Sequence, residues 1–111
     1  MSFHGDKYQT FATLLEQFRS QVVSQQLDAR GIQQQIMLLK QFFQQQILPL
    51  DEGPSPEQSY RTEMSKQLHL LEIDTIFFQG ARQAATAAGR LTAISDRLTK
   101  LIEYCHAVTK L

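Results

Sequence analysis

Apolar side chains recur every three or four positions along most of the chain, from Tyr8 to Val108. This spacing matches the turn of an α-helix and not the two-residue alternation of a β-strand. The most regular stretch lies near the C-terminus and consists of Leu91, Ile94, Leu98, Leu101, Cys105 and Val108. The pattern therefore predicts an all-α protein in which each helix buries one stripe of side chains.

Four helical segments follow from this periodicity and from the residues that start and stop helices. They cover approximately residues 7–26, 29–48, 56–78 and 84–109. Asp28 is expected to cap the second segment, because its carboxylate can accept hydrogen bonds from the first free backbone N–H groups. Pro49 is expected to end that segment. A chain of 111 residues has the length of one domain, so residues 1–111 are predicted to form a single helical domain.

The third segment has a clear start signal after a loop rich in proline and acidic residues. Ser55 is expected to be the N-cap, with Pro56 at the first helical position, where a missing N–H costs nothing. Gln58 lies three residues after Ser55 and would complete a capping box. Glu57 favours the positive end of the helix dipole and can pair with Arg61, four residues further along.

The stretch 79–90 leaves two architectures open. It contains Gly80 and Gly89 but no Pro, Asn or Asp, and it is rich in alanine, the best helix former. If a helix ends at Gly80, the four segments fold into an antiparallel bundle, which is the fold class we favour. If the helix continues, residues 56–109 form one rod of roughly 80 Å at ~1.5 Å per residue. A second chain would then have to cover part of the rod, and self-association to a dimer is expected with either architecture.

The charge balance excludes several classes of partner. Eleven basic residues oppose eleven acidic ones, whereas general nucleic-acid binding and polybasic membrane anchoring need an excess of positive charge. No apolar run approaches the roughly 20 residues that span a bilayer, and the N-terminus does not resemble a secretory signal. We therefore expect a cytoplasmic protein without nucleic-acid binding or membrane insertion.

Residues capable of catalysis or metal binding are few. Cys105 is the only cysteine, and its place on the apolar stripe predicts a small buried side chain instead of a reactive thiol. Glu103 and His106 have the spacing of one ligand pair in di-iron bundles, but His4 and His69 have no Glu three residues before them to form a second pair. Phosphate-binding loops and nucleophile elbows are absent from the sequence. We expect no catalytic residue, cofactor or metal, and a protein that is not an enzyme.

Basic side chains dominate positions 75 to 102, where Asp96 is the one acidic residue. The basic residues are Arg82, Arg90, Arg97 and Lys100. Spacings of eight and seven place the three arginines on roughly one face if the segment is helical. Such a stripe suits an acidic protein surface and is the candidate partner-binding site, although an ordinary solvated helix face explains the same pattern.

The order of several stretches resembles the cyanobacterial PatD family of heterocyst frequency control proteins. These stretches are residues 39–48, 63–71, 74–82, 96–98 and 101–105. The resemblance implies a non-enzymatic regulator that binds FtsZ, the tubulin-like division protein, and modulates FtsZ assembly to control heterocyst frequency. It carries no binding motif that can be placed on individual residues, so the basic stripe is a separate hypothesis.

Two other functions remain open from the residues alone. Apolar side chains outside the main stripes, such as Met37 and Leu38, could serve a self-assembling structural helical protein that has no FtsZ role. The pair of Glu103 and His106 leaves the further alternative of a metal-binding helical bundle.

Overall fold

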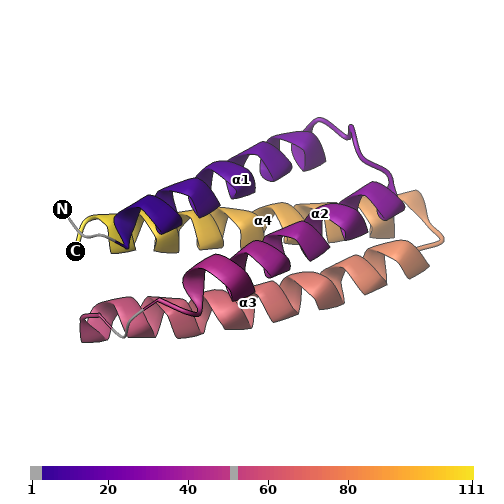
Figure 1. Ribbon diagram of the computed structural model, residues 1–111. Coiled ribbons are helices and arrows are strands. Elements are labelled where there is room, and N and C mark those ends of the chain that lie inside the picture. The colour runs from indigo at the N-terminus through magenta and orange to yellow at the C-terminus, as the bar shows by residue number, and fades with distance from the viewer. Residues whose placement is uncertain (1–3, 51–52) are drawn as a thin grey trace.

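The computed structural model describes residues 4–50 and 53–111, and these residues form an all-α bundle (Figure 1). The α-helices are α1 (Gly5–Val23), α2 (Ala29–Phe42), α3 (Ser55–Gly80) and α4 (Ala84–Thr109). A π-helical turn, η1 (Phe43–Ile47), continues α2. The predicted four-helix bundle is therefore confirmed, and the alternative of one long rod is wrong because the chain reverses between α3 and α4.

Consecutive helices run in opposite directions and pack around one core. Helix α4 lies between α1 and α3, and α2 packs against α3 and α1. The α1–α2 and α3–α4 connections lie at the same end of the bundle, and both chain ends lie at the other (Figure 1). The bundle measures 46 × 21 × 20 Å, and the two longest helices, α3 and α4, run along most of its longest dimension.

The core consists of the predicted apolar stripes. In α1 the buried side chains are Tyr8, Phe11, Ala12, Leu15, Phe18 and Val22. In α4 all members of the predicted stripe are buried except Leu91, which is partly buried. Burial of apolar area at about 25 cal/mol per Å² is the main favourable contribution to folding, and the three-to-four spacing directs it to one face of each helix.

The predicted capping box of the third segment is wrong. Helix α3 begins at Ser55, one residue early, and its N-cap is Pro54, so the Ser55 hydroxyl makes no capping bond. Gly53, with φ of +67°, turns the chain, and Gln58 donates its backbone N–H to the Pro54 carbonyl at 3.2 Å. The Gln58 side-chain amide reaches the Gly53 carbonyl instead of completing a box.

The α3–α4 connection is a three-residue link, Ala81 to Gln83, without turn-forming residues. Helix α3 ends at Gly80 because Ala81 takes an extended conformation, with φ of −72° and ψ of 123°. Gly80 itself does not adopt the left-handed conformation that a glycine C-cap uses, so the position of the helix end was predicted but not its mechanism. Packing of the two apolar stripes against each other explains a reversal that local propensity does not favour.

The second segment starts as predicted and ends next to Pro49 as predicted, but its last turn is π-helical. The Asp28 carboxylate accepts the Gly31 backbone N–H at 2.8 Å, which confirms the N-cap. The helix widens at η1, where the Leu48 N–H donates to the Phe43 carbonyl five residues earlier. Both Phe42 and Phe43 pack against Phe11 of α1, with ring centroids 5.7 and 5.9 Å apart.

Candidate interaction surface

The structure places the predicted basic residues in different environments. Arg82 is exposed in the α3–α4 connection, whereas Arg90, Arg97 and Lys100 belong to α4. Lys100 is exposed, but Arg90 and Arg97 are partly covered by side chains of α3. The four residues therefore do not form a uniform stripe, although their contact with a partner remains a prediction.

Arg97 is committed to a contact inside the bundle. Its Nε donates to the Oδ2 atom of Asp74, which is nearly buried on α3. Its Nη1 donates to the side-chain oxygen of Gln67 at 3.3 Å. An Arg–carboxylate pair of this kind loses much of its attraction for an outside anion, because its charge is already balanced. Arg82, Arg90 and Lys100, which form no ion pair among the described residues, are therefore the members of the predicted set whose charge is available to a partner.

Arg90 connects this basic set to an apolar surface. Its guanidinium carbon lies 4.5 Å from the centroid of the Phe77 ring, within the range of a cation–π contact. Phe77 is 53% exposed although it is one of the largest apolar side chains in the chain. The neighbouring Ile76 is 65% exposed, so an apolar patch on α3 adjoins a cationic side chain from α4.

A groove of about 240 Å³ between α2 and α3 extends this patch. Met37 of α2 and Ile76 of α3 line it, and the buried side chains of Ile36 and Thr75 also contribute to its walls. Glutamine supplies much of its polar lining through Gln33, Gln41, Gln44 and Gln79. The signal in the sequence was the apolar surface of the second segment outside its main stripe, but the sequence did not show that this surface is left uncovered.

A second polar arrangement is buried near the chain ends. Glu57 of α3, 2% exposed, accepts hydrogen bonds from the Tyr8 hydroxyl at 3.2 Å and from Arg61 Nη2. The His4 Nδ1 atom lies 2.6 Å from the same carboxylate oxygen. Burial raises the pKa of Tyr8 to about 12, with a smaller opposing contribution from Arg61.

Arg61 completes this cluster. It donates from Nε to the Tyr8 hydroxyl at 3.0 Å and from Nη1 to the Leu50 carbonyl at 3.2 Å. Among the residues that the structure describes, no buried side-chain nitrogen or oxygen lacks a hydrogen-bond partner. The cluster links the start of α1, the start of α3 and the loop before α3, so its geometry supports a structural role.

The candidate metal pair, Glu103 and His106, lies near the C-terminal end of α4. Glu103 is exposed, and the His106 Nε2 atom lies 3.5 Å from the Glu16 carboxylate of α1. Across residues 4–50 and 53–111, no group of three or more His, Cys, Asp or Glu side chains is arranged to hold a metal ion. Cys105 is buried as predicted, and burial raises the pKa of its thiol to about 12.

Neither the hydropathy of the helices nor comparison with known proteins assigns a function to the chain. None of the helices in the described part of the chain is both long and apolar enough to cross a membrane. Comparisons with models of protein families, with curated proteins and with solved structures found no match.

Proposed function

We propose that this chain is a non-enzymatic, cytoplasmic regulator that binds FtsZ, modulates its assembly and thereby controls heterocyst frequency. The identity of the partner comes from the resemblance of the sequence to the PatD family. The observation that carries a docking role is the Arg90 guanidinium over the exposed Phe77 ring, with Arg82 exposed nearby in the chain. Arginine and aromatic side chains contribute strongly to protein interfaces, and positive charge favours an acidic partner.

The proposed mechanism is surface docking without chemistry. The arginines would guide the encounter with acidic side chains of FtsZ, and Phe77 would supply apolar contact area. A bound helical bundle then changes how FtsZ subunits nucleate or associate laterally. Because the chain has a formal net charge of zero, the attraction comes from local charge placement.

Co-sedimentation with FtsZ polymers tests the proposal. The wild-type chain is expected to pellet with FtsZ and to change the amount of polymer. The double variant Arg82→Glu, Arg90→Glu is expected to bind FtsZ at least about tenfold more weakly, which corresponds to a loss of about 1.4 kcal/mol of binding free energy. Lys100→Glu probes the remaining exposed member of the basic set. Absence of wild-type co-sedimentation, together with unchanged FtsZ assembly, would remove FtsZ as the partner.

Lys66→Glu is the matched control for the charge reversals. Lys66 is an exposed lysine of α3 outside the basic set, so reversing it changes the net charge without altering the proposed contact. Unchanged binding by the arginine variant, or equal loss by both variants, would show that the predicted basic residues do not form the contact. The fold of each variant is checked by circular dichroism.

A self-assembling structural role is the second candidate, favoured by large apolar side chains that the bundle leaves exposed. These are Val23, Met37, Leu38, Leu48, Ile76, Phe77 and Leu111. Sedimentation equilibrium over a wide concentration range tests this role. A dimer or larger oligomer supports it, and a strict monomer excludes it.

A further inference from the structure

The groove between α2 and α3 has the shape and lining of a binding site for another helix. It lies between antiparallel helices, and Met37 and Ile76 project from its two sides with 63% and 65% of their surface exposed. Neighbouring antiparallel helices present a linear groove into which a third helix can insert side chains three or four positions apart. Methionine adapts to partners of different shape because its side chain is unbranched and flexible.

The centre of the groove favours apolar side chains. Lys40 and Glu72 face each other across it with 2.9 Å between Nζ and Oε1, so their charges are balanced. The remaining polar lining consists of glutamine amides and the Thr75 hydroxyl, which bonds back to the Leu71 carbonyl. An occupant therefore gains most from an apolar stripe placed over Met37 and Ile76.

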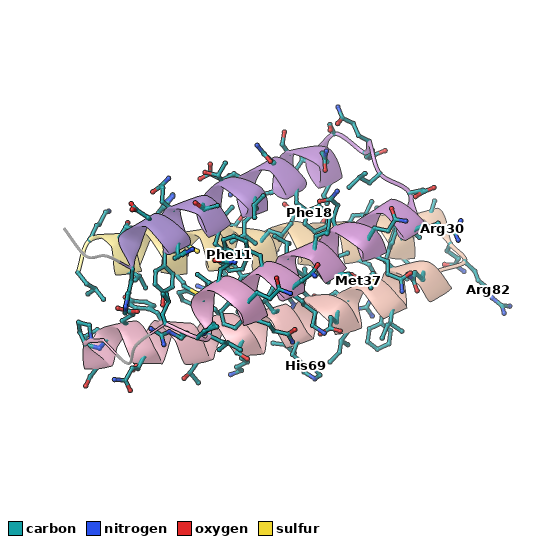
Figure 2. All side chains as sticks on the ribbon, viewed as in Figure 1. Phe11, Phe18, Arg30, Met37, His69 and Arg82 are labelled. Carbon is teal, nitrogen blue, oxygen red and sulfur yellow. The ribbon has the colours of Figure 1, made fainter. Side chains whose placement is uncertain are left out.

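The charge at one end of the groove is strongly one-sided. Figure 2 shows Arg30, at the start of α2, and Arg82, after α3, at the same end of the bundle. Arg30 precedes Gln33 and Met37 by three and seven residues, so it shares their face of α2. Arg90 lies over the ring of Phe77, which follows Ile76 in the sequence but does not line the groove. Within residues 4–50 and 53–111, none of these arginines is ion-paired.

In the described part of the chain, Asp28, Glu72 and Asp74 form no ion pair with these arginines. Asp28 is close to Arg30 in the sequence, but its carboxylate caps α2. Asp74 is paired with Arg97, and Glu72 is paired with Lys40. An occupant that carries carboxylates over this end of the groove would complement Arg30 and Arg82, because unpaired cations of one sign attract the opposite charge.

We propose that the α2–α3 groove binds an amphipathic helix of a partner protein, with an apolar stripe along the groove and acidic side chains at the end near Arg30 and Arg82. The proposal goes beyond FtsZ binding, since it specifies the chemistry of a bound segment and does not require FtsZ to supply it. The apolar stripe gives contact area, and the carboxylates fix the direction in which the helix lies.

Synthetic helix-stapled peptides test this inference by fluorescence anisotropy, without FtsZ in the assay. Two peptides carry leucines at positions three and four apart and glutamates at either the first or the last turn. One control replaces the glutamates with lysines, and another permutes the sequence so that the leucines surround the helix. We expect one acidic peptide to bind, with affinity at least tenfold above that of the lysine peptide, and no binding of the permuted peptide.

Paired variants locate the site. Met37→Gln with Ile76→Gln is expected to reduce binding at least tenfold, whereas Val23→Gln with Leu38→Gln is the matched control. Val23 and Leu38 are similarly exposed, at 67% and 57%, but they do not line this groove. Arg30→Glu with Arg82→Glu should reverse the preference toward the lysine peptide. All six substituted positions are exposed, so circular dichroism should show an intact fold.

Several results would overturn the inference. Absence of binding by both acidic peptides at millimolar concentration excludes an acidic amphipathic helix as the occupant. Equal binding to the groove variant and to the control variant shows that the peptide binds elsewhere. If the wild-type chain dimerises and Met37→Gln with Ile76→Gln abolishes the dimer, a second copy is the occupant. FtsZ is absent from these measurements. A negative peptide result therefore rejects the groove inference without deciding whether the chain binds FtsZ, which the co-sedimentation assay tests separately.

Discussion

At the scale of single residues, Glu57 is the point on which most buried polar contacts converge. Its pairing with Arg61 was predictable, because residues four apart lie next to each other on a helix. Its contacts with His4 and Tyr8 were not, because those residues are separated from Glu57 by 53 and 49 positions. Periodicity identifies neighbours on one helix, whereas this cluster depends on how α1 and α3 meet.

Glu57→Gln should destabilise the fold considerably. The substitution keeps the side-chain shape but removes the charge that balances Arg61, and breaking a buried ion pair by removing one partner costs about 3 kcal/mol. Because Arg61 is partly exposed, the expected loss in the free energy of unfolding lies at the lower end of the range for buried ion pairs. Urea unfolding followed by circular dichroism measures the change in the free energy of unfolding.

Glu72→Gln is the matched control on the same helix. The side chains of Lys40 and Glu72 are each more than one-third exposed, so loss of this ion pair should cost below about 1 kcal/mol. If the two variants lose similar stability, the Glu57 cluster is not the polar anchor that its burial indicates.

At the scale of secondary-structure elements, helix interiors were easier to predict than helix ends. The last segment was predicted at 84–109 and forms α4 over those residues, because its apolar stripe is continuous. The first was predicted at 7–26, but α1 covers Gly5–Val23, and Gln25 has a left-handed φ of 56°. Helix ends depend on single dihedral angles and local bonds, which periodicity does not specify.

Glycine substitutions test how local conformation sets stability in these elements. Gly89 lies inside α4 without positive φ, and a Cβ added there would meet nothing within 4 Å. Gly89→Ala should therefore raise the free energy of unfolding by about 0.5–1 kcal/mol, since alanine favours the helix. Thermal and urea unfolding measure the change.

Gly53→Ala should have the opposite effect. Gly53 has φ of +67°, and its added Cβ would lie 2.6 Å from the Glu57 Oε1 atom. Alanine at that position is strained by the backbone and crowds the buried carboxylate, so we expect a loss of more than about 1 kcal/mol. Stabilisation by Gly53→Ala would show that this turn is not fixed as described.

At the scale of the whole molecule, the candidate surface was only partly predictable. Composition along the chain identified Arg82 and Arg90, because local charge excess needs no tertiary information. The groove was not predictable, because it depends on the alignment of α2 with α3 and on the absence of a covering helix among the described residues. The sequence placed Met37 and Leu38 outside the main apolar stripes, and both side chains are exposed in the bundle.

Stability at high pH is also a property of the whole bundle, because the core contains two groups that burial keeps protonated. The pKa of Cys105 rises from 9.0 to about 12, mainly through burial and secondarily through Glu16. The pKa of Tyr8 rises from 10.0 to about 12, again mainly through burial. Both groups are neutral when protonated, so the folded state favours the protonated form and the unfolded chain releases its protons at lower pH.

The free energy of unfolding should therefore be independent of these groups below about pH 8 and should fall as pH rises toward about 12. The maximum slope is about 1.4 kcal/mol per pH unit for each group, because the unfolded chain binds fewer protons. Cys105→Ala should flatten the curve most between about pH 8 and 9, where the thiol of the unfolded chain titrates and Tyr8 contributes little. Loss of the buried side chain also lowers stability at neutral pH. Urea unfolding at a series of pH values measures this slope. A slope unchanged by Cys105→Ala would mean that the thiol is reached by water in the folded bundle, and the close packing of α4 against α1 at that position would then be wrong.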